Sequence, residues 1–400
     1  MRLPAFAYEV PRSLDEALDL LKSHGPQAKI LAGGTDLLVR MKQGLALPAY
    51  IISLKALPEL ANMHESDGML HIGAGVRLAD ILTYPSMKER WPALFEAVKS
   101  VGAPSIQHFA GTIGGNLCQD NRCHFYNQSS FFRAARQPCN KAGGKTCYAW
   151  EGGSDKCYSI CASDAAPALV AMDAEAVIRS KAGERTIPLA ELYSSVGEHP
   201  LTLADDEMLT EIKVPIPGSG IGTGFEKLTY RSAIDYAIVS AAALVHKEGD
   251  RILKTRLVIG AVARAPLAVP AAEGILQAAR AGDEEALSEA GRAAMNAAQP
   301  FVAYNMYQPK DYRTRMVSVL AKRALKRRAK VLIGPAHLVG LDHNALDAVH
   351  KAGHADARDP DARQIRDNRR VDRIIERFCK RRERLRRGVF SAAQRRFRAV

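Results

Sequence analysis

Thr112-Ile113-Gly114-Gly115-Asn116 is a glycine turn that runs directly into a stretch rich in cysteine. Ser163-Asp164-Ala165-Ala166-Pro167 closes that stretch. Glycines let the backbone approach a phosphate group, and the N–H groups of such a turn point at the anion. The sequence therefore predicts an anion-binding turn beside a cysteine-rich loop at residues 118–161. Six of the seven cysteines of the chain lie in this loop: Cys118, Cys123, Cys139, Cys147, Cys157 and Cys161.

A second glycine turn lies about 80 residues upstream. Ala28–Leu31 is predicted to be a strand, and Ala32-Gly33-Gly34-Thr35-Asp36 follows it before a helical turn at Leu37. This arrangement suits an anion, although it lacks the three spaced glycines of a dinucleotide fingerprint. Alone, it is equally consistent with a plain turn. Together, the two turns predict two lobes that close on one elongated ligand containing a diphosphate.

The pattern outside the turns predicts short strands mixed with helices. Ser13 and Glu16 form a capping box for a helix that ends near His24-Gly25-Pro26. Alternation and β-branched residues predict strands that include 49–53, 69–73, 211–215, 225–230, 237–245 and 257–260. Apolar periodicity predicts helices that include 92–101, 271–281, 284–298 and 311–330.

Length and charge place the chain in a broad class. Its 400 residues are enough for two or three domains. The net charge of +13 belongs largely to residues 331–400, which hold 17 Lys and Arg against 9 Asp and Glu. The charge therefore gives little reason to expect nucleic acid binding by the body of the protein. We expect no membrane span and no export signal, and hence a cytoplasmic protein with reduced cysteines.

The cysteine spacing is Cys118-x4-Cys123-x15-Cys139-x7-Cys147-x9-Cys157-x3-Cys161. Structural zinc sites usually show two close cysteine pairs, and here Cys157 and Cys161 form the closest pair. Iron–sulfur clusters accept wider spacing. The loop also holds seven of the 25 aromatic residues of the chain, which would shield a cluster from water. An iron–sulfur cluster, a zinc site and buried structural thiols all remain open on this reasoning.

The two glycine turns, the Pro4 to Ala17 start, Asp164–Leu169 and Phe225-Glu226-Lys227 resemble the FAD-binding medium subunit of the molybdenum hydroxylases. Xanthine dehydrogenase and carbon monoxide dehydrogenase belong to this family. The resemblance covers roughly residues 1–325. It implies an α+β fold with a two-lobed FAD-binding domain of the vanillyl-alcohol-oxidase (PCMH) type at residues 1–180. A small α+β domain like that of the carbon monoxide dehydrogenase flavoprotein would follow at 181–330, then a basic tail at 331–400.

The resemblance also implies roles for single residues. Asp164 would meet the ribityl chain of FAD, and Leu209 and Lys227 would lie near the isoalloxazine. Judged alone, the plain interpretation of Asp164 is a helix N-cap, and that of Lys227 is a solvated lysine at a strand edge. Tyr230 and Tyr236 could approach the cofactor or fill the core. No side chain is predicted to be catalytic. The pyrophosphate would be held by Lys29, Ile30, Leu31, Ala32, Gly33, Gly34, Thr35 and Asp36, and by Thr112, Ile113, Gly114, Gly115 and Asn116.

The long loop before Asp164 resembles the insertion in the medium subunit of 4-hydroxybenzoyl-CoA reductase, which carries a [4Fe–4S] cluster. The resemblance places the ligands at Cys123, Cys139, Cys147 and Cys157. Cys118 and Cys161 are then spare, and Cys161 is the main rival of Cys157. The implied role is electron transfer from ferredoxin through [4Fe–4S] and FAD to a small [2Fe–2S] subunit and a large molybdopterin subunit, in an (αβγ)2 heterohexamer.

Two alternatives to this role stay open. One is the FAD subunit of another molybdenum hydroxylase, with electrons flowing from substrate to acceptor. The other is an interaction module in which zinc stabilises the loop. For the tail at 331–400, a poorly ordered appendage, a basic arm for nucleic acid or an acidic partner, and a divergent end of the reading frame are all consistent with its composition.

Overall fold

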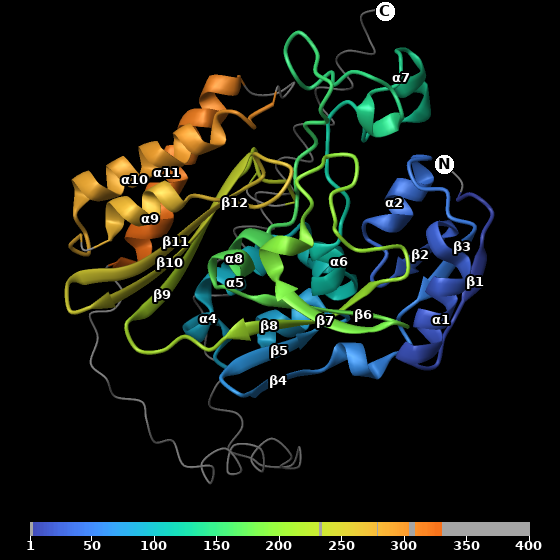
Figure 1. Cartoon of the computed structure of the whole chain (residues 1–400), viewed down its shortest axis with the longest axis horizontal. Helices are drawn as coiled ribbons and strands as arrows, with labels where there is room; N and C mark the ends of the chain where they lie inside the picture. Colours follow the sequence, from blue (N-terminus) through green and yellow to red (C-terminus); the bar gives the residue numbers. More distant parts are fainter. Residues whose placement is uncertain (1–2, 232–233, 278, 304–308, 330–400) are drawn as a thin grey trace, which may run out of the picture. The chain divides into compact units, whose positions relative to one another are not determined.

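The structure is a computed structural model, and it describes residues 3–231, 234–277, 279–303 and 309–329. The basic tail predicted for residues 331–400 lies outside the described residues. None of the helices in the described part of the chain is long and apolar enough to cross a membrane. The architecture is the α+β arrangement predicted from the sequence, with three separate sheets (Figure 1).

The first lobe is built on a small parallel sheet with the order β1-β3-β2. The capping box forms, because Ser13 Oγ accepts a hydrogen bond from the Glu16 N–H at 3.1 Å. Glu16 Oε2 accepts from the Arg12 N–H at 2.7 Å, one residue earlier than the usual partner. Helix α1 ends at His24 with Gly25 as its C-cap, as predicted. The elements are β1 (Ala7–Glu9), α1 (Leu14–His24), η1 (Gly25–Gln27), β2 (Ala28–Leu31), α2 (Leu37–Lys42), β3 (Tyr50–Ser53) and η2 (Pro58–Ala61).

The second lobe is an antiparallel five-stranded sheet in the order β4-β5-β8-β6-β7. Helices pack on it around a core that includes the fully buried Trp91 and Leu94. The strands are β4 (Met63–Ser66), β5 (Met69–Gly73), β6 (Glu175–Ser180), β7 (Gly183–Pro188) and β8 (Met208–Pro215). The helical elements are α3 (Leu78–Thr83), α4 (Met87–Arg90), α5 (Pro92–Lys99), η3 (Pro104–His108), α6 (Ile113–Leu117), α8 (Ala165–Ala171) and η5 (Leu189–Leu192).

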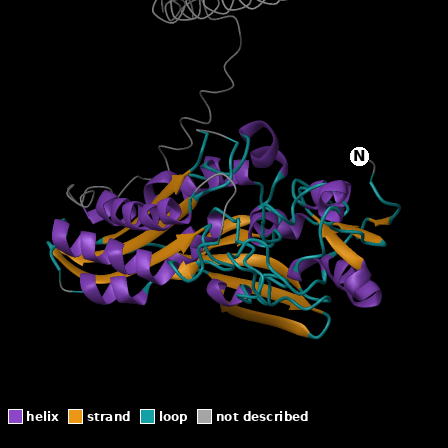
Figure 2. Ribbon diagram, turned by 90° about the horizontal axis from the view of Figure 1, so that it is seen from above, coloured by secondary structure: helices purple, strands orange, loops and turns teal. Residues whose placement is uncertain are grey.

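The C-terminal part is a four-stranded antiparallel sheet in the order β12-β11-β10-β9, with three helices on one face (Figures 1 and 2). Side chains of β10 alternate between faces. Ala241 and Ala243 join the core under the helices, whereas Ala242 and Leu244 join the core of the second lobe. The elements are β9 (Ile221–Leu228), β10 (Val239–Glu248), β11 (Arg251–Gly260), β12 (Leu267–Ala268), α9 (Pro270–Leu276), α10 (Glu284–Ala298) and α11 (Lys310–Ala329).

One predicted helix is shorter than expected. The sequence predicts a helix over residues 271–281, but α9 ends at Leu276 and Gln277 is extended. The chain leaves the helix because it returns to the sheet, where the Ile252 N–H donates to Ala279 O at 3.0 Å. A tertiary contact therefore overrides the alanine-rich pattern.

The cysteine-rich loop leaves the second lobe and returns to it at a narrow neck. Arg122 and Ile160 pair there through two backbone hydrogen bonds of 2.8 and 2.9 Å. Figure 1 shows the loop extending away from the sheets and carrying α7 (Ser130–Ala134). The short turn η4 (Asn140–Ala142) is its other helical element. A small core of its own contains Cys147 and Ala149, packed with Ala303, Cys123, Phe125 and Tyr158.

Candidate functional site

The two predicted glycine turns line one cavity of about 500 Å³, here named the large cavity. Three of the residues predicted to bind FAD do not line it. The Ile113 side chain is fully buried in the core, Leu31 packs beside Gly34, and Lys227 reaches Asp164 from β9. The predicted residues on its wall are Lys29, Ile30, Ala32, Gly33, Gly34, Thr35, Asp36, Thr112, Gly114, Gly115, Asn116, Asp164 and Leu209.

The glycines are required because the backbones pack against one another. A Cβ atom at Gly33 would overlap the carbonyl oxygen of Ala110, just before the second turn. A Cβ atom at Gly114 would lie 2.7 Å from the Ala74 Cβ and carbonyl oxygen. Gly34 adopts a φ of +73°, in the left-handed region that favours glycine. The two turns are thus held together by contacts that leave no room for a side chain.

The second turn also fixes the two ends of the cysteine-rich loop. Thr112 caps α6, since its Oγ1 accepts from the Gly115 N–H at 3.1 Å. Asn116 Oδ1 accepts from Ser163 Oγ at 2.7 Å and from the Ala165 N–H at 3.4 Å. These bonds bring Asp164 to the wall of the large cavity although 47 residues separate it from Asn116.

Asp164 and Lys227 form a buried ion pair of 2.7 Å. Lys227 Nζ also donates to Ser100 O at 2.8 Å and to Asp235 O at 3.0 Å. Burial raises the pKa of Asp164 to about 6, although the charge and hydrogen bond of Lys227 lower it. Asp164 makes no capping hydrogen bond to α8, and the Lys227 side chain is only 7% exposed. Both plain interpretations, a helix cap and a solvated lysine, are therefore wrong.

Two arginines that the sequence reasoning missed line the large cavity. Arg122 pairs with Asp36, and Arg40 lies 2.9 Å from Asp120. The Nε atoms of Arg40 and Arg122 are buried and have no hydrogen-bond partner among the described residues. The positive charges of the two guanidinium groups on the cavity wall fit an anionic ligand such as the diphosphate of FAD. The sequence did contain a signal for Arg122, because this residue follows the second glycine turn closely.

The two tyrosines left open by the sequence differ in position. Tyr236 lines the large cavity, and the Arg122 guanidinium carbon lies 5.4 Å from its ring centroid. Tyr230 is not on the cavity wall, and it is 45% exposed. Neither ring fills the core.

Four of the six cysteines converge on a second, small cavity, here named the cysteine cavity. Cys123, Cys139, Cys147 and Cys157 line it, together with Phe125, Tyr126, Asn140, Lys141, Tyr148 and Ala149. The described cysteines are all free thiols. Within the described ranges, no group of three or more His, Cys, Asp or Glu residues is arranged to hold a single metal ion. Four thiols around one small shared space are a candidate thiolate ligand set for zinc or for an iron–sulfur cluster.

The other two cysteines of the loop lie elsewhere. Cys161 is buried in the core of the second lobe, and Cys118 packs against the same core. Burial raises the pKa of each thiol to about 12. Neither residue lines the cysteine cavity, so these positions suit structural cysteines. Cys161 is therefore a poor substitute for Cys157.

Comparison with known proteins shows a match over nearly all of the described chain. Residues 4–217 match the family described as FAD binding domain in molybdopterin dehydrogenase, and residues 225–328 match the CO dehydrogenase flavoprotein C-terminal domain. The carbon monoxide dehydrogenase medium chain of Hydrogenophaga pseudoflava is 29% identical over 80% of this chain and 96% of its own. The aldehyde oxidoreductase FAD-binding subunit PaoB of Escherichia coli (strain K12) is 30% identical, over 68% and 86%.

A solved structure supports the fold. Carbon monoxide dehydrogenase from Hydrogenophaga pseudoflava superimposes with a TM-score of 0.66 at 28% identity, over 81% of this chain and 97% of the matched one. The predicted architecture of a PCMH-type FAD-binding domain with a carbon monoxide dehydrogenase flavoprotein C-terminal domain is thus confirmed.

Proposed function

Because this chain belongs to the family of FAD-binding subunits of the molybdenum hydroxylases, we propose that it passes electrons between FAD in the large cavity and a second centre in the cysteine cavity. The observation that carries the proposal is the lining of the two cavities. One is walled by both glycine turns, and the other by four cysteines of the inserted loop.

For the large cavity, the residues fit the anionic part of FAD. We propose that Lys29–Asp36 and Thr112–Asn116 hold its pyrophosphate, with Arg40 and Arg122 as additional donors. Leu31 and Ile113 would contribute backbone only, since their side chains do not line the cavity. Asp164 would meet the ribityl chain, with Leu209 and Lys227 near the isoalloxazine. When bound, FAD supplies an acceptor for one or two electrons, and the protein holds it and adjusts its potential.

For the cysteine cavity, we propose a [4Fe–4S] cluster ligated by Cys123, Cys139, Cys147 and Cys157. The shared cavity and the aromatic walls support this ligand set, because apolar surroundings limit access of water. Such a cluster supplies a one-electron carrier. Cations lie near the thiols, since Lys141 lines the cavity and the half-buried Arg264 donates from Nε to the backbone carbonyl oxygen of Cys157 at 2.5 Å.

At the level of substrate, we propose the medium subunit of a 4-hydroxybenzoyl-CoA reductase. The inserted cysteine loop supports this choice, and no side chain of this subunit would touch the acyl-CoA. Ferredoxin would dock as electron donor, and a small [2Fe–2S] subunit and a large molybdopterin subunit would complete an (αβγ)2 heterohexamer. The FAD subunit of another molybdenum hydroxylase is the alternative, since the named relatives act on carbon monoxide and aldehydes.

The test is the cofactor content of the purified full chain. We expect one FAD, about four irons and about four acid-labile sulfides per chain. Cys139→Ser should lose iron and keep FAD. Zinc without iron or sulfide would instead favour the interaction module. Co-purification with a molybdenum subunit, assayed on 4-hydroxybenzoyl-CoA, separates the reductase from the alternative hydroxylases, because only the reductase uses this substrate.

A further inference from the structure

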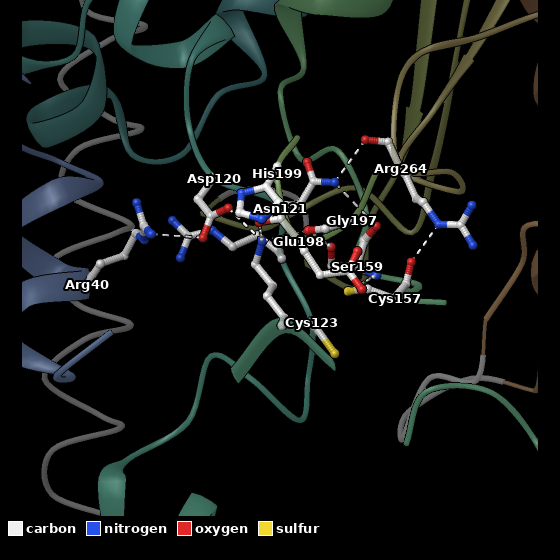
Figure 3. A network of polar contacts seen from close by, with 12 residues as sticks. Arg40, Asp120, Asn121, Cys123, Cys157, Ser159, Gly197, Glu198, His199 and Arg264 are labelled. Atoms are coloured by element: carbon white, nitrogen blue, oxygen red, sulfur yellow. Dashed lines mark hydrogen bonds and ion pairs between the residues drawn. The ribbon is translucent and has the colours of Figure 1, made fainter. Parts of the chain in front are cut away.

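Asp120 lies between the two cavities, and each of its carboxylate oxygens pairs with a different cation. Oδ2 lies 2.9 Å from a terminal nitrogen of Arg40, which lines the large cavity. Oδ1 lies 2.8 Å from Lys141 Nζ, which lines the cysteine cavity. Asp120 is 9% exposed, so these pairs are shielded from water. Figure 3 shows the Arg40–Asp120 contact within this network.

Lys141 is fixed on the cysteine side. Its side chain is 4% exposed, and Nζ also donates to Gly197 O at 2.7 Å. The ammonium lies 5.5 Å from the ring centroid of Tyr126, another wall of the cysteine cavity. The loop segment that carries Cys139 is therefore anchored through a buried charge.

A second connection runs through the neck of the loop. Arg122 pairs with Asp36 and lines the large cavity, and Cys123 follows it directly in the chain. Asp36 also lies 3.9 Å from Arg40. The charges on helix α2 and those at the base of the cysteine-rich loop thus form one connected network.

We propose that Asp120 couples the two cavities, so that filling either one strengthens binding in the other. The inference rests on the proposed function, because it takes FAD and a thiolate-ligated cluster as the occupants. Asp120 acts as a positioning residue and touches neither of them.

The sign of the coupling follows from burial. Removing one partner of a buried ion pair leaves an uncompensated buried charge, so Arg40, Asp120 and Lys141 order together or not at all. An occupant of either cavity binds only the ordered network and therefore stabilises it. Repulsion between two anionic occupants would give the opposite sign, so the sign of the measured coupling tests the proposal.

The experiment measures the FAD dissociation constant by fluorescence titration of the deflavinated full chain. It compares the cluster-containing protein with Cys139→Ser, first in the wild-type background and then in Asp120→Asn. In the wild type, we expect the cluster to tighten FAD binding about five-fold or more, within the range known for coupled sites. In the Asp120→Asn background, the ratio of the FAD dissociation constant without the cluster to that with the cluster should fall to about one. Asp173→Asn is the matched control and should keep the wild-type ratio, because Asp173 is also shared by two cations, Lys254 and Arg256, but is exposed and lines neither cavity.

The reciprocal measurement excludes a merely structural effect. FAD should slow iron loss to a chelator in the wild type and not in Asp120→Asn, since coupling free energies are reciprocal. If Asp120→Asn does not fold, Lys141→Met removes the same link and should also abolish the ratio. A wild-type ratio of one or less, or an unchanged ratio in Asp120→Asn, overturns the inference alone. A wild type without iron overturns the proposed function, and the inference with it.

Discussion

The walls of the large cavity come from many segments and include the two glycine turns, whereas the cysteine cavity is lined by residues of a single loop. The turns belong to two different lobes, and glycine lets them pack without side chains between them. The cysteine cavity lies within one insertion that closes at the Arg122–Ile160 neck. The difference teaches that the first site depends on the whole fold, while the second depends on a few local side chains. Substitutions should therefore change FAD binding and iron content independently of each other.

The largest difference between iron content and FAD binding is expected from cysteine substitutions. Cys147→Ser removes a thiol from the cysteine cavity, and the variant should lose essentially all of its iron while FAD remains bound. Cys161→Ala should keep its iron, because Cys161 lies in the core of the second lobe. Iron and flavin analysis of both purified variants provides the measurement. Loss of iron from Cys161→Ala alone would show that the ligand set is wrong.

The next largest effect is expected at the contact between the turns. In Gly33→Ala, the new Cβ overlaps Ala110 O, so the lobes must separate and FAD binding should weaken about 100-fold, or about 3 kcal/mol. Gly274→Ala is the matched control, because a Cβ there meets nothing within 4 Å and the site is helical. Fluorescence titration with FAD compares the two. Equal affinities would contradict a close-packed backbone site.

The free energy of unfolding should also depend on pH through Asp164 on the wall of the large cavity. Burial raises the pKa of Asp164 to about 6. A carboxyl group whose pKa is raised by folding stabilises the fold below its unfolded pKa, and this stability is lost as the pH rises through the folded pKa. Relative to Asp164→Asn, the free energy of unfolding of the wild type should fall by about 2–3 kcal/mol between about pH 4 and pH 7. Urea unfolding at several pH values measures this, and parallel pH profiles would contradict it.

The smallest effect is expected on the outer side of the cysteine cavity. The Arg136 guanidinium carbon lies 5.3 Å from the Phe125 ring centroid and 5.4 Å from that of Tyr148, and both rings line the cavity. Arg136→Ala should raise the alkylation rate of the thiols in the metal-free chain about two- to five-fold, with FAD binding unchanged. Lys99→Ala, which removes the Lys99–Phe95 contact away from both cavities, should leave the rate unaltered. An equal change in both variants would argue against local shielding by Arg136.

Local sequence patterns predicted much of the fold. The capping box at Ser13, the glycine turns and the helix at 284–298 were all visible in the chain, because each depends on neighbours within a few residues. The end of α9 was not, since it depends on pairing with β11. The glycine turns and Asp164 were likewise found as a site, but Arg40 and Arg122 were missed, because their role depends on cavity walls formed by distant segments.

By itself, the sequence determined that this protein has two glycine turns, in the same order along the chain as in the family that it resembles. It also determined that a cysteine-rich insertion lies between the second turn and Asp164. The resemblance had singled out four of the six cysteines, but only the tertiary structure showed that these four share a cavity and that the carboxylate of Asp120 joins that cavity to the large one. It also decided that Asp164 pairs with Lys227 and caps no helix. The physical reason is that spacing fixes local conformation, whereas burial and charge pairing depend on residues brought together from far apart in the chain.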